Sequence, residues 1–600
     1  MRNRLGPLGS SLVLLAVACG SGATQPFDDM NPAAPGAGSE AGTGGTPSTS
    51  GGPSDAAAPS DAGDASTACV PSTDLWPSLI PGQGQAGYDA ALAAAVAKYD
   101  RYHEAVGSFA TGLSGSNTLG ADASARQKLD HLLATPWSAT DVDPTDDLLQ
   151  YESLDPKTLV TSWGLATGMY AGSELAADAY RYGVLRDRGG SCTDMARARK
   201  MLQIGIDAFH VVVAITGGGG SIARAIARND LPGDGAAPVV PLFDAQHHPL
   251  PATKDNGTWR ADNSAGGAFS KYIWWDSCSR DMLFGWTMGI AAAWEVIAND
   301  PTFSAATKTQ LRADAKSVLD GLMVVRPSGK DLEIWDPDGR MTLNGNMNET
   351  SIDRTYVIKN GVASMMALGE VAGLVYVVGD APAQAYLTSL VTTRGLPVAT
   401  TQTMDVIALG GDSSNHSSFN MLFMTAWMAH RYIPDAAVRT QLRAPMEQSV
   451  YRPLFGAKPS DWKQSFFDLV VAASSGDAWV DGPASASLDA PAVARGLETL
   501  SQFPPAPFYA VPKSNCDDGE LAAKQCVLLD GTTVVSLSSV KAGVVADKPI
   551  PMAYRPPSNF FWRTNPFLVN SPPGGDPNVV FPGSDLRATY WLGRWVRRAP

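Results

Sequence analysis

The strongest constraint on the fold is that two kinds of helix alternate along the chain. Residues 281–299 are apolar nearly all round, which is typical of a helix buried on every side. In residues 304–324 the apolar side chains form one stripe against lysines, an arginine and aspartates, which is typical of a surface helix covering a core. A fully buried helix is therefore followed by a covering helix.

The same pairing recurs further along the chain. Residues 417–432 are apolar all round and are followed by a striped segment, residues 435–454, and residues 356–378 and 381–391 repeat the pair less cleanly. Roughly ten to twelve such helices fit between residues 88 and 502, joined by turns rich in Pro, Gly and Asn. Because an inner helix has to bury both faces, we predict a mainly α fold, an (α/α)-barrel (toroid) of six inner and six outer helices.

Small β additions accompany the helices. Residues 526–536 and 331–343 have strand character, and Asp338-Gly339 in the second segment is a hairpin-turn signal. No repeat of fixed length is visible, so an array of TPR or HEAT repeats is the weaker interpretation. We see no linker in residues 75–600 and predict one barrel domain with an irregular, partly β C-terminal region.

The first residues predict export from the cytoplasm. Arg2 and Arg4 precede an apolar run, residues 12–18, that is far shorter than the ~20 residues a membrane span needs. The run ends at Cys19, and residues 15–19 resemble a bacterial lipobox, although Ala16 stands where that pattern prefers leucine. We predict a signal peptide (residues 1–18), lipidation of Cys19 and a disordered tether rich in Gly, Ser, Ala and Pro (residues 19–74). The protein would then be anchored in the bacterial cell envelope, at the outer membrane, or secreted if an ordinary signal peptide is cleaved.

The charge of the chain restricts its partners. A formal net charge of −14 argues against a nucleic-acid partner and against binding to an anionic membrane surface, because neither attracts a protein without a basic face. Contact with the membrane is expected through the N-terminal lipid alone.

The cysteines fit an oxidising compartment. Cys516 and Cys526 are close enough in sequence to close a small loop by a disulfide, and we favour a second bond between Cys192 and Cys278. A zinc site is the rival interpretation, but the chain has no CxxC or HxxxH spacing. We therefore expect no metal and no cofactor.

Polar and titratable side chains gather in three loops that lead into all-round apolar helices. If these helices form the inner ring, the loops meet at one mouth of the barrel. Aromatic rings beside carboxylates suit sugars, whose C–H faces stack on the rings while their hydroxyls bond to Asp, Asn and Arg. The candidate residues are Tyr272, Trp274, Trp275, Asp276, Arg280 and Asp281 in the first loop, Asn348, Glu349, Asp353 and Arg354 in the second, and Asp412, Asn415 and His416 in the third.

Each candidate also has a purely structural interpretation. Asp281 fits a helix cap as well as a catalytic acid, because an oxygen there accepts from the free N–H groups of the first turn. Trp274 and Trp275 suit the core, since tryptophans are usually well buried. His416 and Asp412 suit local hydrogen bonds in their turns.

Two further motifs carry weaker signals. His247 and His248 could join a carboxylate around a metal, but adjacent residues rarely bind one ion. The four glycines at 217–220 look like a phosphate-binding loop but lack its GK[ST] ending, so we interpret them as a hinge. The sequence contains no GxSxG and no HExxH motif.

Several short segments resemble an uncharacterised group of secreted bacterial (α/α)-barrel proteins. The resemblance spans most of residues 190–600, and its barrel is similar to those of many glycoside hydrolases and polysaccharide lyases. It implies a fold and not a reaction. The segments are WDSCSRD at 275–281 with Gly285, DPDG at 336–339, SNHS at 414–417, FWRTNPF at 561–567 and YWLGRW at 590–595.

We expect a glycan, or another polyhydroxylated substrate, to bind in the barrel cleft and to be cleaved there. Hydrolysis needs one carboxylic acid to protonate the leaving oxygen and a second to activate water or attack the sugar. We expect Asp281 to be the acid and Asp412 or Glu349 the base. The planar guanidinium of Arg280 would orient the substrate.

Two other functions stay open. His416 with a tyrosine of the cleft, for example Tyr272, would support β-elimination from a uronic acid, as in a polysaccharide lyase. Alternatively, the protein is a glycan-binding or envelope-scaffold lipoprotein without catalysis.

Overall fold

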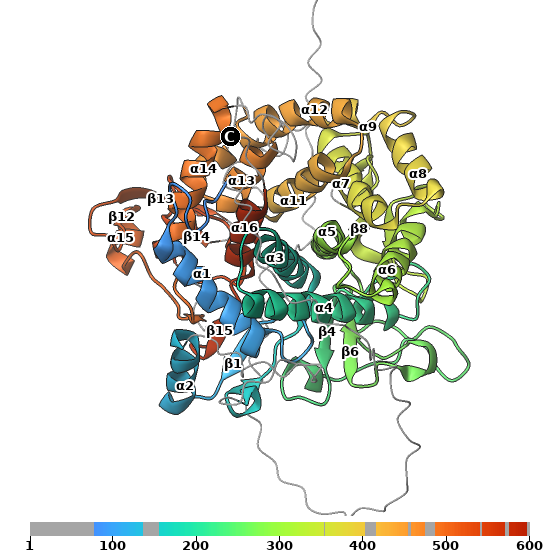
Figure 1. Cartoon of the computed structure of the whole chain (residues 1–600), viewed down its shortest axis with the longest axis horizontal. Helices are drawn as coiled ribbons and strands as arrows, with labels where there is room; N and C mark the ends of the chain where they lie inside the picture. The colour runs from blue at the N-terminus through green and yellow to red at the C-terminus, as the bar shows by residue number, and fades with distance from the viewer. Residues whose placement is uncertain are drawn as a thin grey trace, which may run out of the picture. The chain divides into compact units, whose positions relative to one another are not determined.

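The computed structural model describes residues 77–135, 155–352, 354–401, 416–453, 458–474, 486–540, 543–570 and 575–596. Among these residues, six helices form an inner ring in which each helix contacts the next and the last contacts the first (Figure 1). In ring order they are α3 (Gly168–Asp187), α5 (Arg280–Ile297), α7 (Gly361–Val378), α11 (His416–Tyr432), α13 (Ser465–Ser474) and α16 (Ser584–Trp595).

Six further helices of the described part contact this ring from outside. Helix α5 is buried on almost every side, whereas α6 buries one stripe that includes Leu311, Ala315 and Val318. The predicted (α/α)-barrel of inner and outer helices is therefore confirmed. The outer helices are α1 (Ala90–Tyr102), α4 (Cys192–Ala214), α6 (Ala305–Met323), α8 (Ala381–Val391), α12 (Ala436–Pro445) and α14 (Ala486–Ser501), and the short helices α2 (Ala123–Ala134), α9 (Leu396–Ala399) and α15 (Asp518–Ala523) lie outside this pairing.

The inner helices α3 and α5 touch backbone to backbone. A Cβ atom at Gly172 would lie 2.1 Å from the carbonyl oxygen of Gly285, and one at Gly285 would lie 2.3 Å from the carbonyl oxygen of Gly168. Any larger residue would force the helices apart. Helix α5 also contacts α11 across the ring, so side chains fill the space between these helices.

The ring closes where the last helix, α16, meets α1 and α3. The guanidinium of Arg587 is fully buried, donates to Asp100 and Asp178 at 2.7 Å each, and pairs with Glu174. His103 contacts Asp178 from the other side at 2.9 Å. Burial alone would raise the pKa of Asp178, but His103 and Arg587 hold it well below its usual value. We call Arg587, Asp100, Glu174, Asp178 and His103 the closure network.

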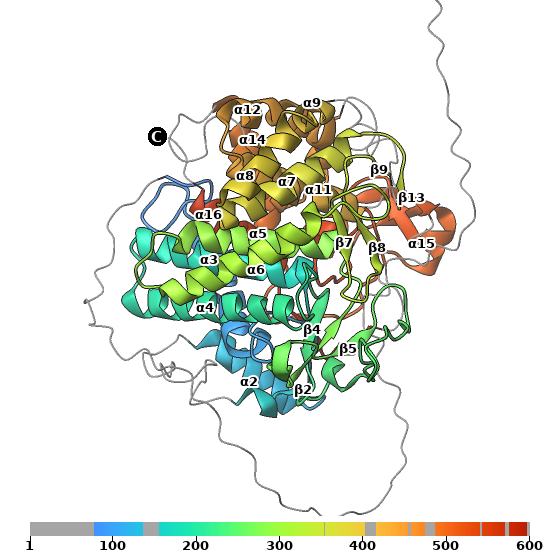
Figure 2. The ribbon, with the colours of Figure 1, turned by 90° about the vertical axis from the view of Figure 1, so that its right-hand side faces the viewer.

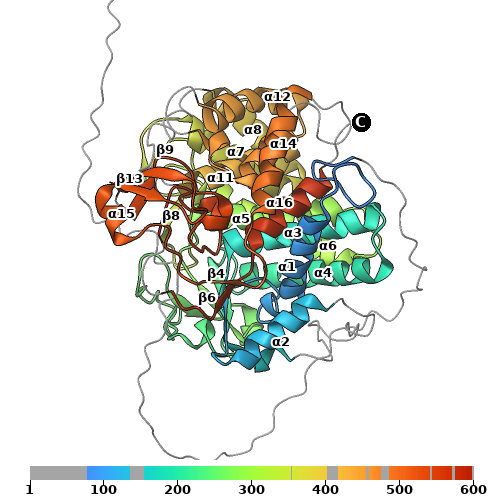
Figure 3. The same ribbon diagram turned by 90° about the vertical axis from the view of Figure 1, so that its left-hand side faces the viewer.

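Small antiparallel sheets gather at one end of the helices, which we call the rim. Figure 2 and Figure 3 both place β4 and β8 there. Strand β3 runs into α3, and β6 leads through residues 276–279 into α5, so inner helices begin at the rim. The predicted hairpin at residues 331–343 is confirmed as β7–β8, with Trp335 opposite Met341. The sheets are β3 (Ala166–Thr167), β4 (Ala225–Arg228), β6 (Tyr272–Trp275) and β5 (Trp259–Ala261); β11 (Phe508–Tyr509), β15 (Val579–Phe581), β1 (Asn117–Leu119) and β2 (Val160–Ser162); β7 (Glu333–Trp335) and β8 (Met341–Asn346); β9 (Ser351–Ile352) and β10 (Thr355–Tyr356).

A small β lobe near the C-terminus has its own core. Its sheet has the order β12 (Gln525–Val527), β13 (Val534–Val540) and β14 (Gly543–Ala546), which bears out the strand character of residues 526–536. The predicted Cys516–Cys526 disulfide is present, with the two Cα atoms 5.6 Å apart, and both cysteines lie in the core of the lobe.

The predicted pairing of Cys192 with Cys278 is wrong. Cys192 is disulfide-bonded, but Cys278 is a free, buried thiol, so the partner of Cys192 lies outside the described residues. The distance along α4 explains the error. Val212, near the end of α4, accepts a hydrogen bond from Ala223, beside the strand that leads to Cys278. Cys192 begins the same helix, roughly 30 Å away at 1.5 Å per residue.

Helix α7 is long and apolar enough to cross a membrane, but 89% of it is buried inside the fold. It is a helix of the inner ring. The predicted signal peptide, Cys19 and the tether lie outside the described residues.

Candidate functional site

The candidate site lies at the rim, where α5 begins. Ser279 is the N-cap residue of this helix, and its hydroxyl donates to the carboxylate of Asp281, which is 7% exposed. The guanidinium of Arg224 donates to the Ser279 hydroxyl at 3.2 Å and to the Ser277 carbonyl at 3.1 Å. Asp281 is therefore held by a chain of hydrogen bonds that ends in a positive charge.

Tyr170, in the first turn of α3, lies beside this chain. Its ring is 5.3 Å from that of Phe560, and the Arg563 guanidinium lies over it at 5.6 Å from its centroid. Burial raises the pKa of the Tyr170 phenol and Asp281 adds to the rise, while Arg563 and Arg224 oppose it. We call Tyr170, Arg224, Asp281 and Arg563 the rim cluster. It brings together four separate segments of the chain.

His416 begins α11, which contacts α5. Its ring lies 5.0 Å from that of Trp462 and 6.3 Å from that of Phe567. Burial, with a contribution from Arg555, lowers the pKa of His416 to about 4, so the imidazole is neutral at neutral pH. Neither ring nitrogen has a hydrogen-bond partner in the part of the chain that the structure describes.

One turn into α11, Asn420 reaches the start of α3. Its amide nitrogen lies 3.6 Å from the Sδ atom of Met169, the residue before Tyr170. The structure thus brings two of the predicted catalytic residues, Asp281 and His416, to the first turns of α5 and α11, two inner helices that contact each other across the ring.

Glu370 lies inside the ring on α7 and was missed by the sequence analysis. It is fully buried, and it accepts a hydrogen bond from the Thr287 hydroxyl at 2.5 Å. Burial raises the pKa of Glu370 to about 8, although the bond from Thr287 opposes this, so the carboxyl carries its proton at neutral pH. A single acid within an otherwise apolar helix was a visible signal for a special role.

Asp276, expected to bind substrate, is engaged by the protein itself. It is completely buried, and its carboxylate contacts Arg260 at 2.8 Å and Arg340 at 3.0 Å. It also accepts the Thr258 N–H at 2.7 Å. These contacts fasten the loop before α5 to its neighbours.

The three predicted aromatic platforms lie on strand β6. Trp274 is fully buried, and its indole N–H donates to the Ala261 carbonyl at 2.9 Å. The rings of Trp275 and Trp259 are 5.1 Å apart, and the Arg228 guanidinium lies 5.3 Å from the ring of Tyr272. These contacts are with the sheet and not with the rim cluster.

The second predicted loop makes contacts of its own. Glu349 pairs with Arg394, which also bonds to Asp331 at 2.6 Å. Arg354 is exposed, and its Nε donates to Asn344 at 3.2 Å. Arg280 begins α5 and is half-buried. Asp353, Asp412 and Asn415 lie outside the described residues.

One group of side chains among the described residues has the spacing of metal ligands. Cys516, Glu520 and Cys526 place three ligand atoms within 4.8 Å of one another. Because the two sulfurs are joined in the disulfide, they do not offer thiolates to a metal.

Comparisons with known proteins find only distant similarities. The sequence matches no protein-family model and no curated protein. Among solved structures, the chain is similar to cellulase Cel9M of C. cellulolyticum (11% identity, TM-score 0.36, covering 85% of this chain and 99% of that one) and to a Bacteroides ovatus GH9 protein (10%, 0.34, 85% and 83%). It is also similar to endoglucanase CelQ from Clostridium thermocellum in complex with cellotetraose (10%, 0.34), covering 72% of this chain and less than two thirds, 63%, of that one.

Proposed function

We propose that the chain binds a glycan at the rim and hydrolyses it, with Asp281 and Asp412 as the two carboxylates. The observation that supports this proposal is the rim cluster. It gathers a carboxylate, a phenol and two guanidinium groups beside the ring of Phe560.

The chemistry of the rim cluster suits a sugar. Hydroxyl groups bond to carboxylates and guanidinium groups, and the apolar face of a sugar ring stacks on an aromatic ring. Tyr170 and Asp281 are 8% and 7% exposed and Arg563 is half-buried, so a small part of each of these side chains is open to a ligand.

Hydrolysis requires a second carboxylate facing the same cleft. Of the two expected partners, Glu349 is occupied by Arg394. Asp412 precedes His416 by four residues and remains our candidate. One of the pair would donate a proton to the leaving oxygen while the other activates water.

A specific observation favours β-elimination as the second candidate. Arg224 and Arg563 both act on the phenol of Tyr170, and His416 begins α11, where Asn420 reaches Met169, the residue before Tyr170. The guanidinium groups would hold the carboxylate of a uronic acid, and Tyr170, in place of the expected Tyr272, would deliver a proton to the leaving oxygen. The proton beside the uronate carboxyl leaves to a base, for which neutral His416 is suited, and a carbon–carbon double bond forms as the glycosidic C–O bond breaks.

One assay separates these functions. The full chain is incubated with a panel of polysaccharides, and new reducing ends and unsaturated uronates are measured. We expect Asp281→Asn to abolish hydrolysis, whereas Tyr170→Phe abolishes elimination. A matched control is Asp435→Asn, which alters the capping residue of an outer helix, α12. If the chain binds a glycan but forms neither product, its function is glycan binding without catalysis. If Asp281→Asn binds the glycan with wild-type affinity, the glycan does not bind at the rim cluster.

We also propose that the protein is a lipoprotein of the cell envelope, anchored through Cys19. The Cys516–Cys526 disulfide supports a compartment outside the cytoplasm, where such bonds persist. Cys19→Ala should release the protein from membranes in cell fractionation, while Cys278→Ala, at a buried free thiol, should leave it in the membrane fraction. A Cys19→Ala protein that stays membrane-bound would contradict the anchor.

A further inference from the structure

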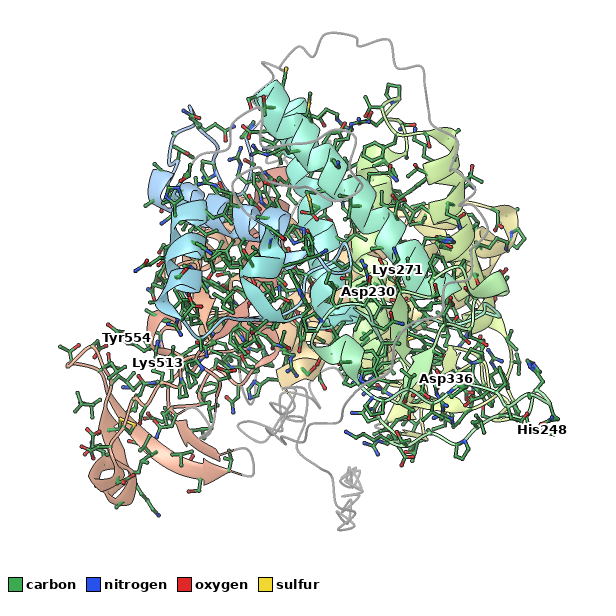
Figure 4. All side chains as sticks on the ribbon, turned by 90° about the horizontal axis from the view of Figure 1, so that it is seen from below. Asp230, His248, Lys271, Asp336, Lys513 and Tyr554 are labelled. Carbon is green, nitrogen blue, oxygen red and sulfur yellow. A yellow bond between two sulfur atoms is a disulfide. The ribbon has the colours of Figure 1, made fainter. Side chains whose placement is uncertain are left out.

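A second concave site lies at the rim, over the outer helices. It is a pocket of about 360 Å³, a volume typical of small-molecule sites. Its walls come from the loop after α4, the segment around His247 and the turn of the β7–β8 hairpin, which contains Asp336. Figure 4 shows Asp336 among the loops at this end and His248 at their outer edge.

The glycine loop at 217–220 forms one wall of the pocket and is anchored at both ends. A Cβ atom at Gly217 would lie 2.4 Å from the Asn263 amide, and one at Gly220 would lie 2.4 Å from Gly321 of α6. Gly218 and Gly219 have φ angles of 88° and 73°, and a Cβ atom at either would meet nothing within 4 Å. The loop therefore presents bare backbone to the pocket, a different role from the hinge expected from sequence.

Aromatic rings form two other walls. The rings of Phe243 and His247 stack at 4.2 Å with their planes 21° apart. His247 has a φ angle of 64°, which is uncommon for a residue with a side chain and marks local backbone strain. Trp335 also lines the pocket. Two aromatic walls suit a ring-shaped ligand with an apolar face.

Arg326 supplies a positive charge. Its guanidinium lies 5.1 Å from the centroid of the Trp335 ring, and one of its nitrogens donates to the Gly321 carbonyl at 3.1 Å. Its Nε is buried and has no hydrogen-bond partner in the part of the chain described here. A buried donor of this kind without an acceptor costs free energy unless a ligand supplies one.

Asp336 faces the pocket from the hairpin turn. Its carboxyl accepts the Ser277 N–H at 3.0 Å and contacts Arg340 at 3.2 Å. Burial, then the neighbouring charge of Asp276, raises the pKa of Asp336 to about 7. Near neutral pH the group is therefore divided between an acceptor and a donor of hydrogen bonds, both of which a sugar hydroxyl can meet.

We propose that this pocket binds a single acidic sugar ring, a uronic acid residue, at a site separate from the rim cluster. The sugar ring lies between Trp335 and the Phe243–His247 stack. Its carboxylate accepts from Arg326, whose planar donors match a carboxylate. Its hydroxyls bond to Asp336 and to the backbone of the glycine loop.

The loop before α5 separates the two sites. The backbone of Ser277 bonds to Asp336 on the pocket side, whereas the side chain of Ser279 bonds to Asp281 on the side of the rim cluster. Sugar binding in the pocket therefore does not depend on hydrolysis at the rim cluster, and an experiment can disprove either proposal without disproving the other.

The test is calorimetric titration of the full chain with D-glucuronic acid and with D-glucose. We expect one glucuronate site per chain and weaker binding of glucose, which lacks the carboxylate. Arg326→Gln should raise the Kd for glucuronate roughly tenfold, the loss of about one charged hydrogen bond. His247→Gly should also weaken binding while relieving the backbone strain, so it is expected to fold.

Two matched variants complete the design. Arg312 lies on α6, with its guanidinium 5.7 Å from the ring of Trp294, so Arg312→Gln removes an equivalent contact away from the pocket. Asp281→Asn alters the rim cluster alone. Both should bind glucuronate as the wild type does.

Four results would overturn the proposal. They are an absence of glucuronate binding at millimolar concentrations, glucose binding as tight as that of glucuronate, wild-type affinity in both Arg326→Gln and His247→Gly, and loss of glucuronate binding in Asp281→Asn. The last result would place the sugar at the rim cluster and would support the proposed function instead.

Discussion

The closure network and the rim cluster both combine carboxylates with guanidinium groups, but they differ in the partners that these charged groups have. In the closure network, Arg587 is completely buried and each of its three nitrogens meets a carboxylate. In the rim cluster, Asp281 is held by a hydroxyl, and the buried Nε of Arg563 has no hydrogen-bond partner in the described structure. Carboxylates and guanidinium groups that pair with one another hold the fold, although the Oε1 atom of Glu174 in the closure network also has no hydrogen-bond partner among the described residues. Groups without a charged partner are the ones available to a ligand.

The largest expected effect is the loss of stability when the closure network is broken. Arg587→Met leaves Asp100, Glu174 and Asp178 buried without their guanidinium partner. Removing one member of a buried ion pair costs about 3 to 5 kcal/mol, and we expect at least this loss in the free energy of unfolding measured in urea.

The matched control for this variant is an exposed pair. Lys316 contacts Asp320 at 3.0 Å and Asp380 at 3.2 Å on the surface of α6. Lys316→Met should change stability by less than about 1 kcal/mol. Equal losses in the two variants would show that the closure network is not a special feature of the ring.

The next largest effect is expected in the free energy of unfolding at acidic pH, through His416 at the rim. The pKa of His416 is lowered to about 4, against about 6.5 for an ordinary histidine. The unfolded chain takes up a proton near pH 6.5 and buried His416 does not, so the stability present above pH 6.5 is lost as the pH falls towards 4. At pH 5 the loss is about 2 kcal/mol.

His416→Phe should therefore flatten the decline in unfolding free energy between pH 6.5 and pH 4. Buried His430, whose pKa is lowered to about 3, leaves a residual slope in every variant. Exposed His131, on α2, offers the control His131→Gln, which should keep the wild-type profile. An unchanged slope in His416→Phe would mean that His416 is not neutral in the folded protein.

A smaller effect on stability is expected at Asp281. Asp281→Asn keeps the shape of the side chain and the hydrogen bond to Ser279, so the free energy of unfolding should stay within about 1 kcal/mol of the wild type. Glycan binding or cleavage at the rim should nevertheless be lost. A variant that unfolds would show that Asp281 belongs with the structural charges and not with the site.

The smallest expected effect is the labelling of Cys278 by thiol reagents in the native protein. Cys278 lies in the loop between the two sites, but burial raises the pKa of its thiol well above the usual value. The native protein should leave Cys278 unlabelled, and urea should expose it. Rapid labelling without denaturant would show that the loop opens in the native state.

The fold could be predicted from the sequence because a helix that is buried on every side has apolar residues at nearly all of its positions. An inner helix such as α7 reads as apolar in every direction, and the first residues of such helices, including Asp281 and His416, had to share one rim. Tyr170 and Arg563 could not be found in this way, since they come from opposite ends of the chain. Asp276 looked available in the sequence because nothing there shows that Arg260 reaches it.

The ring can close only after the last helix of the chain has been synthesised. Asp100 lies in the first outer helix, whereas Arg587 lies in the last helix of the ring, 487 residues later. While a ribosome is still making the chain, Glu174 and Asp178 lack the guanidinium of Arg587, and Asp100 has only the more distant Arg181, at 3.5 Å, so burying these carboxylates would be unfavourable. A partly made chain is therefore disfavoured from collapsing into a closed barrel until α16 has been added.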